Sequence, residues 1–212
     1  MLTEKIRNVL VLAPHTDDGE LGAGGTISYM LEKEAKVYYA AFSTASDSVP
    51  PGMPKDILKT EVRKATHQLG INEDNLLIFD YQVRKLNFSR QEILEDLIRL
   101  RNNIHFDLIL MPSLNDIHQD HLTVSQEGLR AFKTTSILGY ELIWNNLTFN
   151  TTCFVRIEEQ HLQNKINALK SYGSQKGRDY VSAEFIKSLA IARGVQIGAK
   201  YAEAFEVIRW VI

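Results

Sequence analysis

The apolar run from Val9 to Ala13 constrains the fold more than any other feature, because no polar residue alternates with the apolar ones. Such a run is typical of a strand buried on both faces of a parallel sheet. A charged stretch, Pro14 to Glu20, follows at once, and a glycine-rich segment then leads into an amphipathic stretch. Strand, loop and helix in this order favour an open α/β sheet.

The rest of the chain continues this alternation. Further strands are expected at Val37–Phe42, Leu76–Phe79, Asp107–Met111, Ile137–Ile143, Cys153–Ile157 and Phe205–Ile212. Helices are expected over 20–33, 57–69, 90–102, 122–132, 158–171 and 183–193. Strands that alternate with helices predict a mostly parallel sheet with helices on both faces. Because no repeat or linker divides the 212 residues, we expect one domain over 1–212.

Composition narrows the functional class. The net charge is −2 and no basic run is present, which argues against binding to nucleic acid or to an anionic membrane. The apolar run near the N-terminus is too short for a secretory signal or an integral membrane segment. Cys153, the one cysteine, cannot form an internal disulfide, and this suits a reducing compartment. We therefore expect a cytoplasmic protein.

Two clusters of metal-ligand residue types each follow a predicted buried strand: His15, Asp17 and Asp18 after the first, and Asp116 to His121 after Asp107–Met111. Loops at the carboxyl ends of strands form the ligand crevice of such sheets. A catalytic zinc needs about three nitrogen and oxygen ligands with one position left open. The predicted ligands are His15, Asp18 and His121.

The remaining polar residues of the clusters suit catalysis. Asp17 is the predicted general base for a water molecule activated by the metal ion. His118 is predicted to stabilise an oxyanion or to protonate the leaving group, and Asp120 to hold the other ring nitrogen of His118. The predicted chemistry is metal-assisted hydrolysis of an acyl bond, with Zn²⁺ as the expected ion and Fe²⁺ or another divalent metal as the alternative.

These motifs resemble known signatures. Pro14 to Glu20 resembles the PHPDDxE signature of the PIG-L/LmbE-type metal-dependent N-deacetylases, and His118 to His121 resembles their HxDH signature. The resemblance extends to Gly24–Thr26 and to Tyr201–Phe205, and so spans nearly the whole chain. Thr16 and Gln119 stand where the family usually has proline, and neither position is a ligand.

The resemblance implies a Rossmann-like fold that removes acyl groups, usually acetyl, from N-acyl amino sugars. By this resemblance Asp17 matches the family's general base and His118 its oxyanion-side histidine. The matches to the family's zinc ligands are His15, Asp18 and His121. Many relatives carry a substrate-binding arginine before the helix that contains Glu61, where this chain has Leu58 and Lys59. Other candidate substrate contacts are Arg178, Tyr180 and Glu203.

We therefore expect a zinc-dependent N-deacetylase that releases acetate and a free amine. Its expected partner is a small-molecule N-acyl amino sugar, nucleotide- or lipid-linked forms included, and a homo-oligomer is compatible with the sequence. A metal-dependent phosphoester hydrolase and a non-catalytic sugar- or nucleotide-binding protein remain as alternatives. The glycines after the first strand do not keep the G-x-G-x-x-G spacing of a dinucleotide site, and Asp17 and Asp18 would repel a pyrophosphate.

Overall fold

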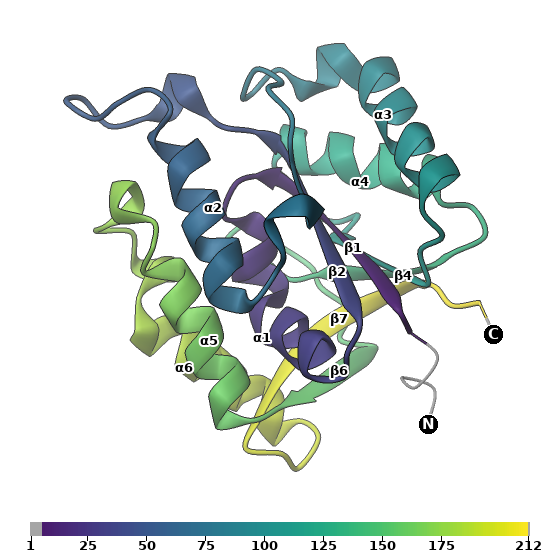
Figure 1. Cartoon of the computed structure of the whole chain (residues 1–212). Helices are drawn as coiled ribbons and strands as arrows, with labels where there is room; N and C mark the ends of the chain where they lie inside the picture. The colour runs from purple at the N-terminus through teal and green to yellow at the C-terminus, as the bar shows by residue number, and fades with distance from the viewer. Residues whose placement is uncertain (1–5, 212) are drawn as a thin grey trace.

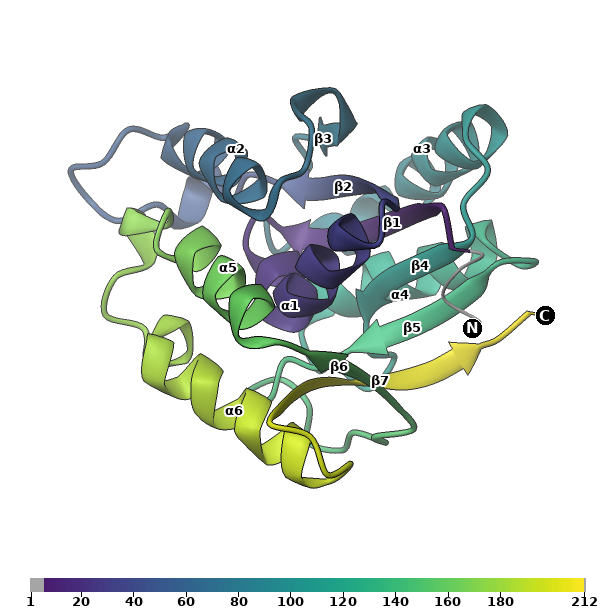
Figure 2. The same ribbon diagram turned by 60° about the horizontal axis from the view of Figure 1, so that its bottom comes forward.

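A seven-stranded sheet runs through the molecule in the order β3-β2-β1-β4-β5-β7-β6 (Figures 1 and 2). The structure is a computed structural model and describes residues 6–211. Its strands are β1 (Asn8–His15), β2 (Lys36–Ser43), β3 (Leu76–Ile78), β4 (Leu108–Pro112), β5 (Ser136–Tyr140), β6 (Cys153–Ile157) and β7 (Tyr201–Arg209). The first five are parallel to one another, and β7 is antiparallel to both β5 and β6. The predicted mostly parallel α/β sheet is confirmed.

Helices cover both faces of the sheet (Figure 2). One face carries α1 (Asp18–Glu32), α2 (Ile57–Leu69), α5 (Glu159–Leu169) and α6 (Ala183–Val195), and the other carries α3 (Arg90–Asn103) and α4 (Gln119–Ala131). Successive side chains of a strand point to opposite faces. Accordingly Val9 and Val11 of β1 belong to one apolar core, while Leu10 and Leu12 belong to the other.

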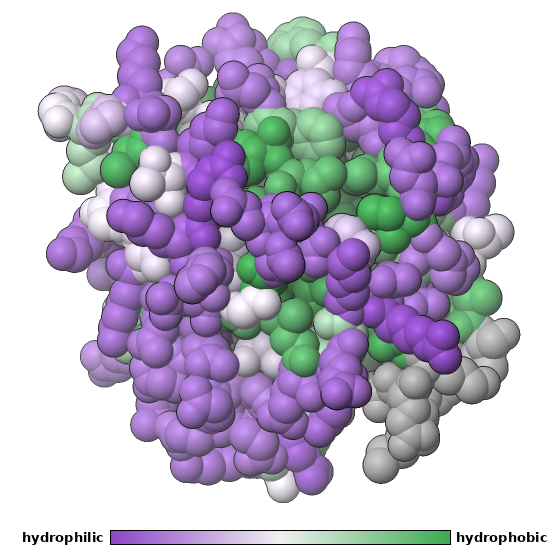
Figure 3. Space-filling model, in the orientation of Figure 1, coloured by the Kyte–Doolittle hydropathy of each residue, from purple (hydrophilic) through white to green (hydrophobic). Residues whose placement is uncertain are grey.

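The sheet ends in a short edge strand. The three residues of β3 are half-buried. Figure 3, which looks onto this edge, shows apolar side chains between the hydrophilic ones of the flanking helices. Short edge strands limit pairing with other chains.

No helix within residues 6–211 is long and apolar enough to cross a lipid bilayer.

The last strand departs from its prediction. It begins at Tyr201 rather than at Phe205 and ends at Arg209, while Ile212 lies outside the described residues. Residues 201–206 are buried because β7 lies between β5 and β6. Two glutamates within that buried segment, Glu203 and Glu206, interrupt its apolar pattern, so the pattern did not indicate where the strand begins. Similarly, β5 ends at Tyr140 rather than at Ile143.

Glu203 stabilises a break in α1. At Ala23 the backbone is not helical, with φ −140° and ψ 15°. The Glu203 carboxylate accepts hydrogen bonds from the backbone N–H groups of Gly25 at 3.0 Å and Thr26 at 2.6 Å. It also forms a buried ion pair with Lys165, Nζ to Oε1 2.6 Å. The glutamate thus caps the second half of α1 as an N-cap residue would.

The order of the strands creates a crevice at one edge of the sheet. From β1 the chain builds outward through β2 to β3, and then returns to place β4 on the other side of β1. At such a switch point the loops that follow the two central strands diverge and leave a crevice. His15 is the last residue of β1, and His121 lies in the first turn of α4, which follows β4, so the topology brings them together.

Candidate active site

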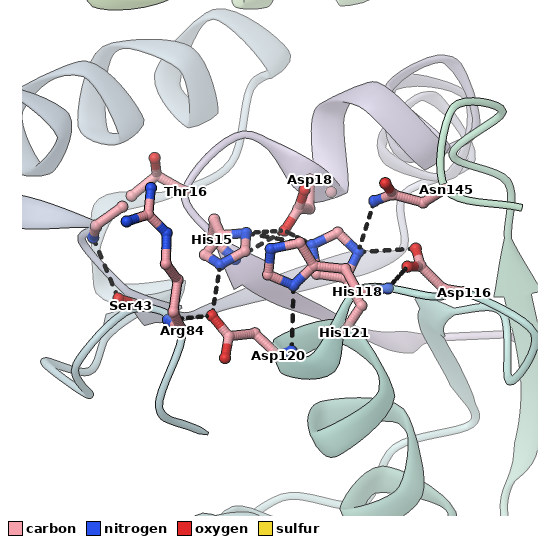
Figure 4. Close-up of polar contacts among 12 residues, drawn as sticks. His15, Thr16, Asp18, Ser43, Arg84, Asp116, His118, Asp120, His121 and Asn145 are labelled. Atoms are coloured by element: carbon pink, nitrogen blue, oxygen red, sulfur yellow. Dashed lines mark hydrogen bonds and ion pairs between the residues drawn. The ribbon is translucent and has the colours of Figure 1, made fainter. Parts of the chain in front are cut away.

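Three ligand atoms form a nearly equilateral triangle above β1 and β4 (Figure 4). Asp18 Oδ2 lies 3.1 Å from His15 Nδ1 and 3.2 Å from His121 Nε2, and the two nitrogens are 3.2 Å apart. Ligands of a tetrahedral zinc ion at ordinary bond lengths are roughly 3.3 Å from one another. Two imidazoles and a carboxylate at this spacing therefore fit a divalent ion with further positions left for water or substrate.

The β1 loop is held rigidly. Asp18, the first residue of α1, accepts a hydrogen bond from the His15 N–H at 2.8 Å. The hydroxyls of Tyr39 and Tyr172 both donate to the carbonyl of Thr16, at 3.0 and 2.6 Å. Both tyrosines also contact the carboxylate of the fully buried Glu20. Burial raises the pKa of Glu20 to about 8, which favours its neutral form.

Each histidine of the triangle is oriented by a second carboxylate. Asp116 Oδ2 lies 2.8 Å from His121 Nδ1, and Asp120 Oδ2 lies 3.0 Å from His15 Nε2. Carboxylates in these positions fix the tautomer and the ring orientation of a metal-binding histidine. Asp116 also accepts a hydrogen bond from the backbone N–H of His118 at 2.8 Å, which orders the loop before α4.

The prediction that the Asp120 carboxylate holds the other ring nitrogen of His118 is wrong. That carboxylate contacts His15 Nε2 and accepts hydrogen bonds from the backbone N–H groups of Arg84 at 2.6 Å and Leu86 at 3.3 Å. Residues two apart at a helix start point in different directions, so the side chains of His118 and Asp120 diverge. Asp120 is a positioning residue for a candidate ligand.

His118 is a neutral hydrogen-bond donor. As the N-cap of α4 it accepts, through Nδ1, a hydrogen bond from the Asp120 N–H at 3.1 Å, so Nε2 carries the proton. Burial, together with His121 and His15, lowers the pKa of His118 to about 4. Nitrogens of His15, His118 and His121 also lie within 4.8 Å of one another. The triangle with Asp18 is tighter, and we favour it as the ligand set.

Asp17 lies at the mouth of the site as the N-cap of α1, and its side chain has no capping hydrogen bond. Burial, reinforced by Asp18, raises the pKa of Asp17 to about 6. For His15 and His121, burial opposes the charged ring, but Asp18 and the two orienting carboxylates outweigh it and raise their pKa values to about 9 and 10. A bound divalent ion would displace these protons.

The candidate ligands line a cleft with a volume of about 190 Å³. Arg178 and Tyr180 line it as predicted, and the Tyr180 ring stacks on Trp144 with centroids 4.1 Å apart. Lys59 is exposed and does not line the cleft, although its neighbour Leu58 does. Glu203 does not line it either, because it caps α1.

Several lining residues were not predicted from the sequence, and they come from loops without a recognisable pattern. They include Arg84, Trp144 and Asn145. Arg84 has a positive φ of 66°, which is uncommon for a residue other than glycine. Its loop comes after β3, at the same edge of the sheet as the two motifs. That position was the one available signal.

Several proteins similar to this chain are deacetylases. The family model described as "PIG-L: GlcNAc-PI de-N-acetylase" matches residues 10–132. The Escherichia coli K12 protein YaiS, named an uncharacterized deacetylase, is 29% identical over an alignment of 176 residues that covers 80% of this chain and 92% of YaiS. The diacetylchitobiose deacetylase of Thermococcus kodakarensis is 22% identical over 96% of this chain and 84% of its own.

A solved structure has the same fold. The N,N'-diacetylchitobiose deacetylase of Pyrococcus horikoshii superimposes with a TM-score of 0.81 at 20% identity, covering 97% of this chain and 85% of that enzyme. The family model covers more than half of the chain, including both clusters and the strands that carry them. This chain belongs to the PIG-L family.

Proposed function

We propose that the protein is a metal-dependent N-deacetylase that hydrolyses the acetamide of an N-acetylated amino sugar. The observation that carries this proposal is the triangle of His15, Asp18 and His121 with Asp17 and His118 beside it in one cleft. Membership of a family of de-N-acetylases supports it. A zinc ion is the metal that these ligand types fit best.

The chain itself supplies the proton transfers. The metal ion, when bound, supplies Lewis acidity and lowers the pKa of water. Asp17 accepts the proton of the attacking water, and the new carbon–oxygen bond forms at the acetamide carbonyl. His118 donates its Nε2 proton in a hydrogen bond to the developing oxyanion. The proton held by Asp17 then passes to the nitrogen as the carbon–nitrogen bond breaks. The amine is released, and the carboxyl group loses the remaining proton of the water to solvent and leaves as acetate.

The cleft suits a sugar ring. Aromatic faces, such as the Trp144 and Tyr180 stack, pack against the apolar side of a ring. Thr16 Oγ1 and Gln175 Oε1 are buried without a hydrogen-bond partner among the described residues, and both residues line the cleft. Buried polar atoms without a partner cost stability, so a hydroxyl group that reaches them would be bound favourably.

Metal analysis combined with an acetate-release assay tests this function. The metal-loaded protein should contain about one zinc per chain and release acetate from N-acetylated amino sugars. Asp17→Asn should keep the metal and lose about 100-fold or more in kcat, because the base is removed and the ligands are not. Lys59→Gln, outside the cleft, serves as the control. A fully active Asp17→Asn variant would contradict the proposed role of Asp17.

A phosphoester hydrolase remains the second candidate because two arginines, Arg84 and Arg178, line the cleft. Phosphoester hydrolysis commonly uses a pair of metal ions about 3.5–4 Å apart. Among residues 6–211 one group of potential metal ligands is found, the nitrogens of His15, His118 and His121, and it suits a single ion. Release of inorganic phosphate without acetate from a phosphorylated N-acetyl sugar would favour this second function.

A further inference from the structure

Two arginines of the cleft lack the acidic partners that other arginines of the chain have. Arg84 and Arg178 both line the cleft and are exposed. Within residues 6–211 neither guanidinium has a carboxylate oxygen within 4.0 Å. By contrast, several other arginines pair with a glutamate or an aspartate, namely Arg63, Arg90, Arg99, Arg130 and Arg193. The two unpaired guanidinium groups therefore face the same space as the candidate ligands.

The first of these arginines is tied to the candidate metal site. The backbone N–H of Arg84 donates a hydrogen bond to Asp120 Oδ2 at 2.6 Å, and the same carboxylate oxygen lies 3.0 Å from His15 Nε2. One carboxylate thus orients a candidate ligand and holds Arg84 at its positive φ. Figure 4 shows the Arg84 side chain extending beside His15 toward Thr16. The structure maintains an unfavourable backbone conformation at this residue.

The second arginine is held from its own segment. Arg178 donates a hydrogen bond to the Tyr180 hydroxyl, and its guanidinium carbon lies 5.8 Å from the centre of the Tyr180 ring. The ring in turn stacks on Trp144. A guanidinium that packs against an aromatic ring loses less freedom when it binds a ligand. Both arginines are therefore positioned before a substrate enters.

The chemistry of the guanidinium groups points to an anionic ligand. The carboxylates around the candidate metal site have partners of their own: Asp116 and Asp120 lie against His121 and His15, and Asp18 lies between those two histidines. Within residues 6–211 the two guanidinium groups have no carboxylate partner, so they are available to an anion that enters the cleft. Arginine presents paired N–H donors in a plane and binds carboxylate and phosphate oxygens in this way.

We propose that Arg84 and Arg178 bind a carboxylate or phosphate group of the substrate, so that the protein acts on an anionic N-acyl amino sugar in preference to a neutral one. This inference rests on the proposed N-deacetylase function. The two arginines act on substrate binding and take no part in the proton transfers, so their replacement should raise KM more than it lowers kcat.

The test compares four probes that share one acetamide. They are the methyl glycoside of N-acetylglucosamine, its carboxymethyl glycoside, N-acetylglucosamine 1-phosphate and N-acetylglucosamine 6-phosphate. Acetate release by the metal-loaded protein gives kcat and KM for each. We expect at least one anionic probe to exceed the methyl glycoside by about 10-fold or more in kcat/KM. The carboxymethyl and phosphate probes distinguish the two sources of negative charge.

Variants then assign the preference to the arginines. Arg84→Gln and Arg178→Gln should each remove about 10-fold from kcat/KM of the preferred anion, through KM, and leave the methyl glycoside within about twofold. Arg84→Lys should recover part of the loss because it keeps the charge. Lys85→Gln is the matched control, since Lys85 is exposed in the same loop and does not line the cleft. Equal loss for neutral and anionic probes would overturn the proposal.

Binding separates this inference from the proposed function. Calorimetry with glucosamine 1-phosphate and with glucosamine on the metal-loaded protein needs no catalysis. Tighter binding of the phosphate form that Arg84→Gln and Arg178→Gln abolish supports the anion site, even if no probe releases acetate and the N-deacetylase function fails. Acetate release without any preference for anions, in rates or in binding, overturns the anion site and leaves the deacetylase intact.

Discussion

At the scale of single residues, His15 and His121 share one design. Each presents one ring nitrogen to Asp18 and the other to a buried carboxylate, Asp120 or Asp116. Because the second carboxylate holds the proton of the ring on the far side, the nitrogen that faces the triangle keeps its lone pair for a metal ion. The metal affinity should therefore depend on residues that do not touch the metal.

Replacement of Asp116 tests this dependence. In Asp116→Asn the Nδ1 proton of His121 loses its charged acceptor, so the zinc dissociation constant should rise about 10- to 100-fold. Competition with a chromogenic chelator measures it. Asp96→Asn is the control, because Asp96 also accepts hydrogen bonds, from Tyr81 and Arg99, but none of these three residues lines the cleft. An unchanged dissociation constant in Asp116→Asn would rule out this role of Asp116.

The functional roles of side chains were predictable where residues with metal-binding or catalytic chemistry cluster in the sequence, and were not predictable elsewhere. Sequence reasoning singled out His15, Asp18 and His121, and the structure brings their side chains together. It missed Arg84, because a lone arginine in a loop has no distinguishing pattern. It also assigned the wrong partner to Asp120, because the direction of a side chain at a helix start depends on backbone angles that spacing does not reveal.

At the scale of elements, the broken helix α1 depends on β7. Glu203 is the acceptor for two N–H groups at the break and the partner of buried Lys165. Removal of one member of a buried ion pair leaves the other charge without compensation, which costs more than the pair itself contributes. The β1 loop and its candidate ligands stand at the start of this helix, so the break lies directly behind the site.

Replacement of Glu203 should therefore affect stability rather than substrate recognition. We expect Glu203→Ala to lower the free energy of unfolding by about 3–5 kcal/mol, measured by urea denaturation. Adding Lys165→Met to Glu203→Ala should recover part of this loss, since the uncompensated charge is gone. Glu159→Ala, which removes an exposed pair with Lys200 and a hydrogen bond from the Tyr201 hydroxyl, should cost much less. A cost no greater in Glu203→Ala would refute the capping role.

Most helices and strands were predictable from apolar periodicity, because most of their buried residues are apolar. The final strand shows the limit of that signal. Its buried glutamates are stabilised by partners far away in the sequence, Lys165 for Glu203 and Ser113 for Glu206. No local pattern can reveal such partners, so a buried charged residue reads as an exposed one until the fold is known.

At the scale of the whole molecule, one ion would join two separate halves of the sheet. His15 ends β1, Asp18 begins α1, and His121 lies in the first turn of α4 after β4. The sequence predicted this meeting because both clusters follow buried strands. It could not predict that β1 and β4 are neighbours, since strand order depends on long-range pairing.

Removal of the metal should weaken the molecule as a whole. A ligand at 1,000 times its dissociation constant stabilises the folded state by about 4 kcal/mol. For a chain of this size we expect a chelator to lower Tm by about 10 °C and added zinc to restore it. Differential scanning calorimetry measures the shift. His121→Ala should show no response to either addition, and a metal-dependent shift that survives in it would indicate a different site.

The position of β7 also bears on how the protein matures. A nascent chain that has left the ribosome as far as β6 already contains every residue of the ligand triangle. It still lacks the strand that fills the space between β5 and β6 and supports the break in α1 through Glu203. Metal capture is therefore expected to follow the synthesis of β7, and a polypeptide truncated before Tyr201 should retain no zinc.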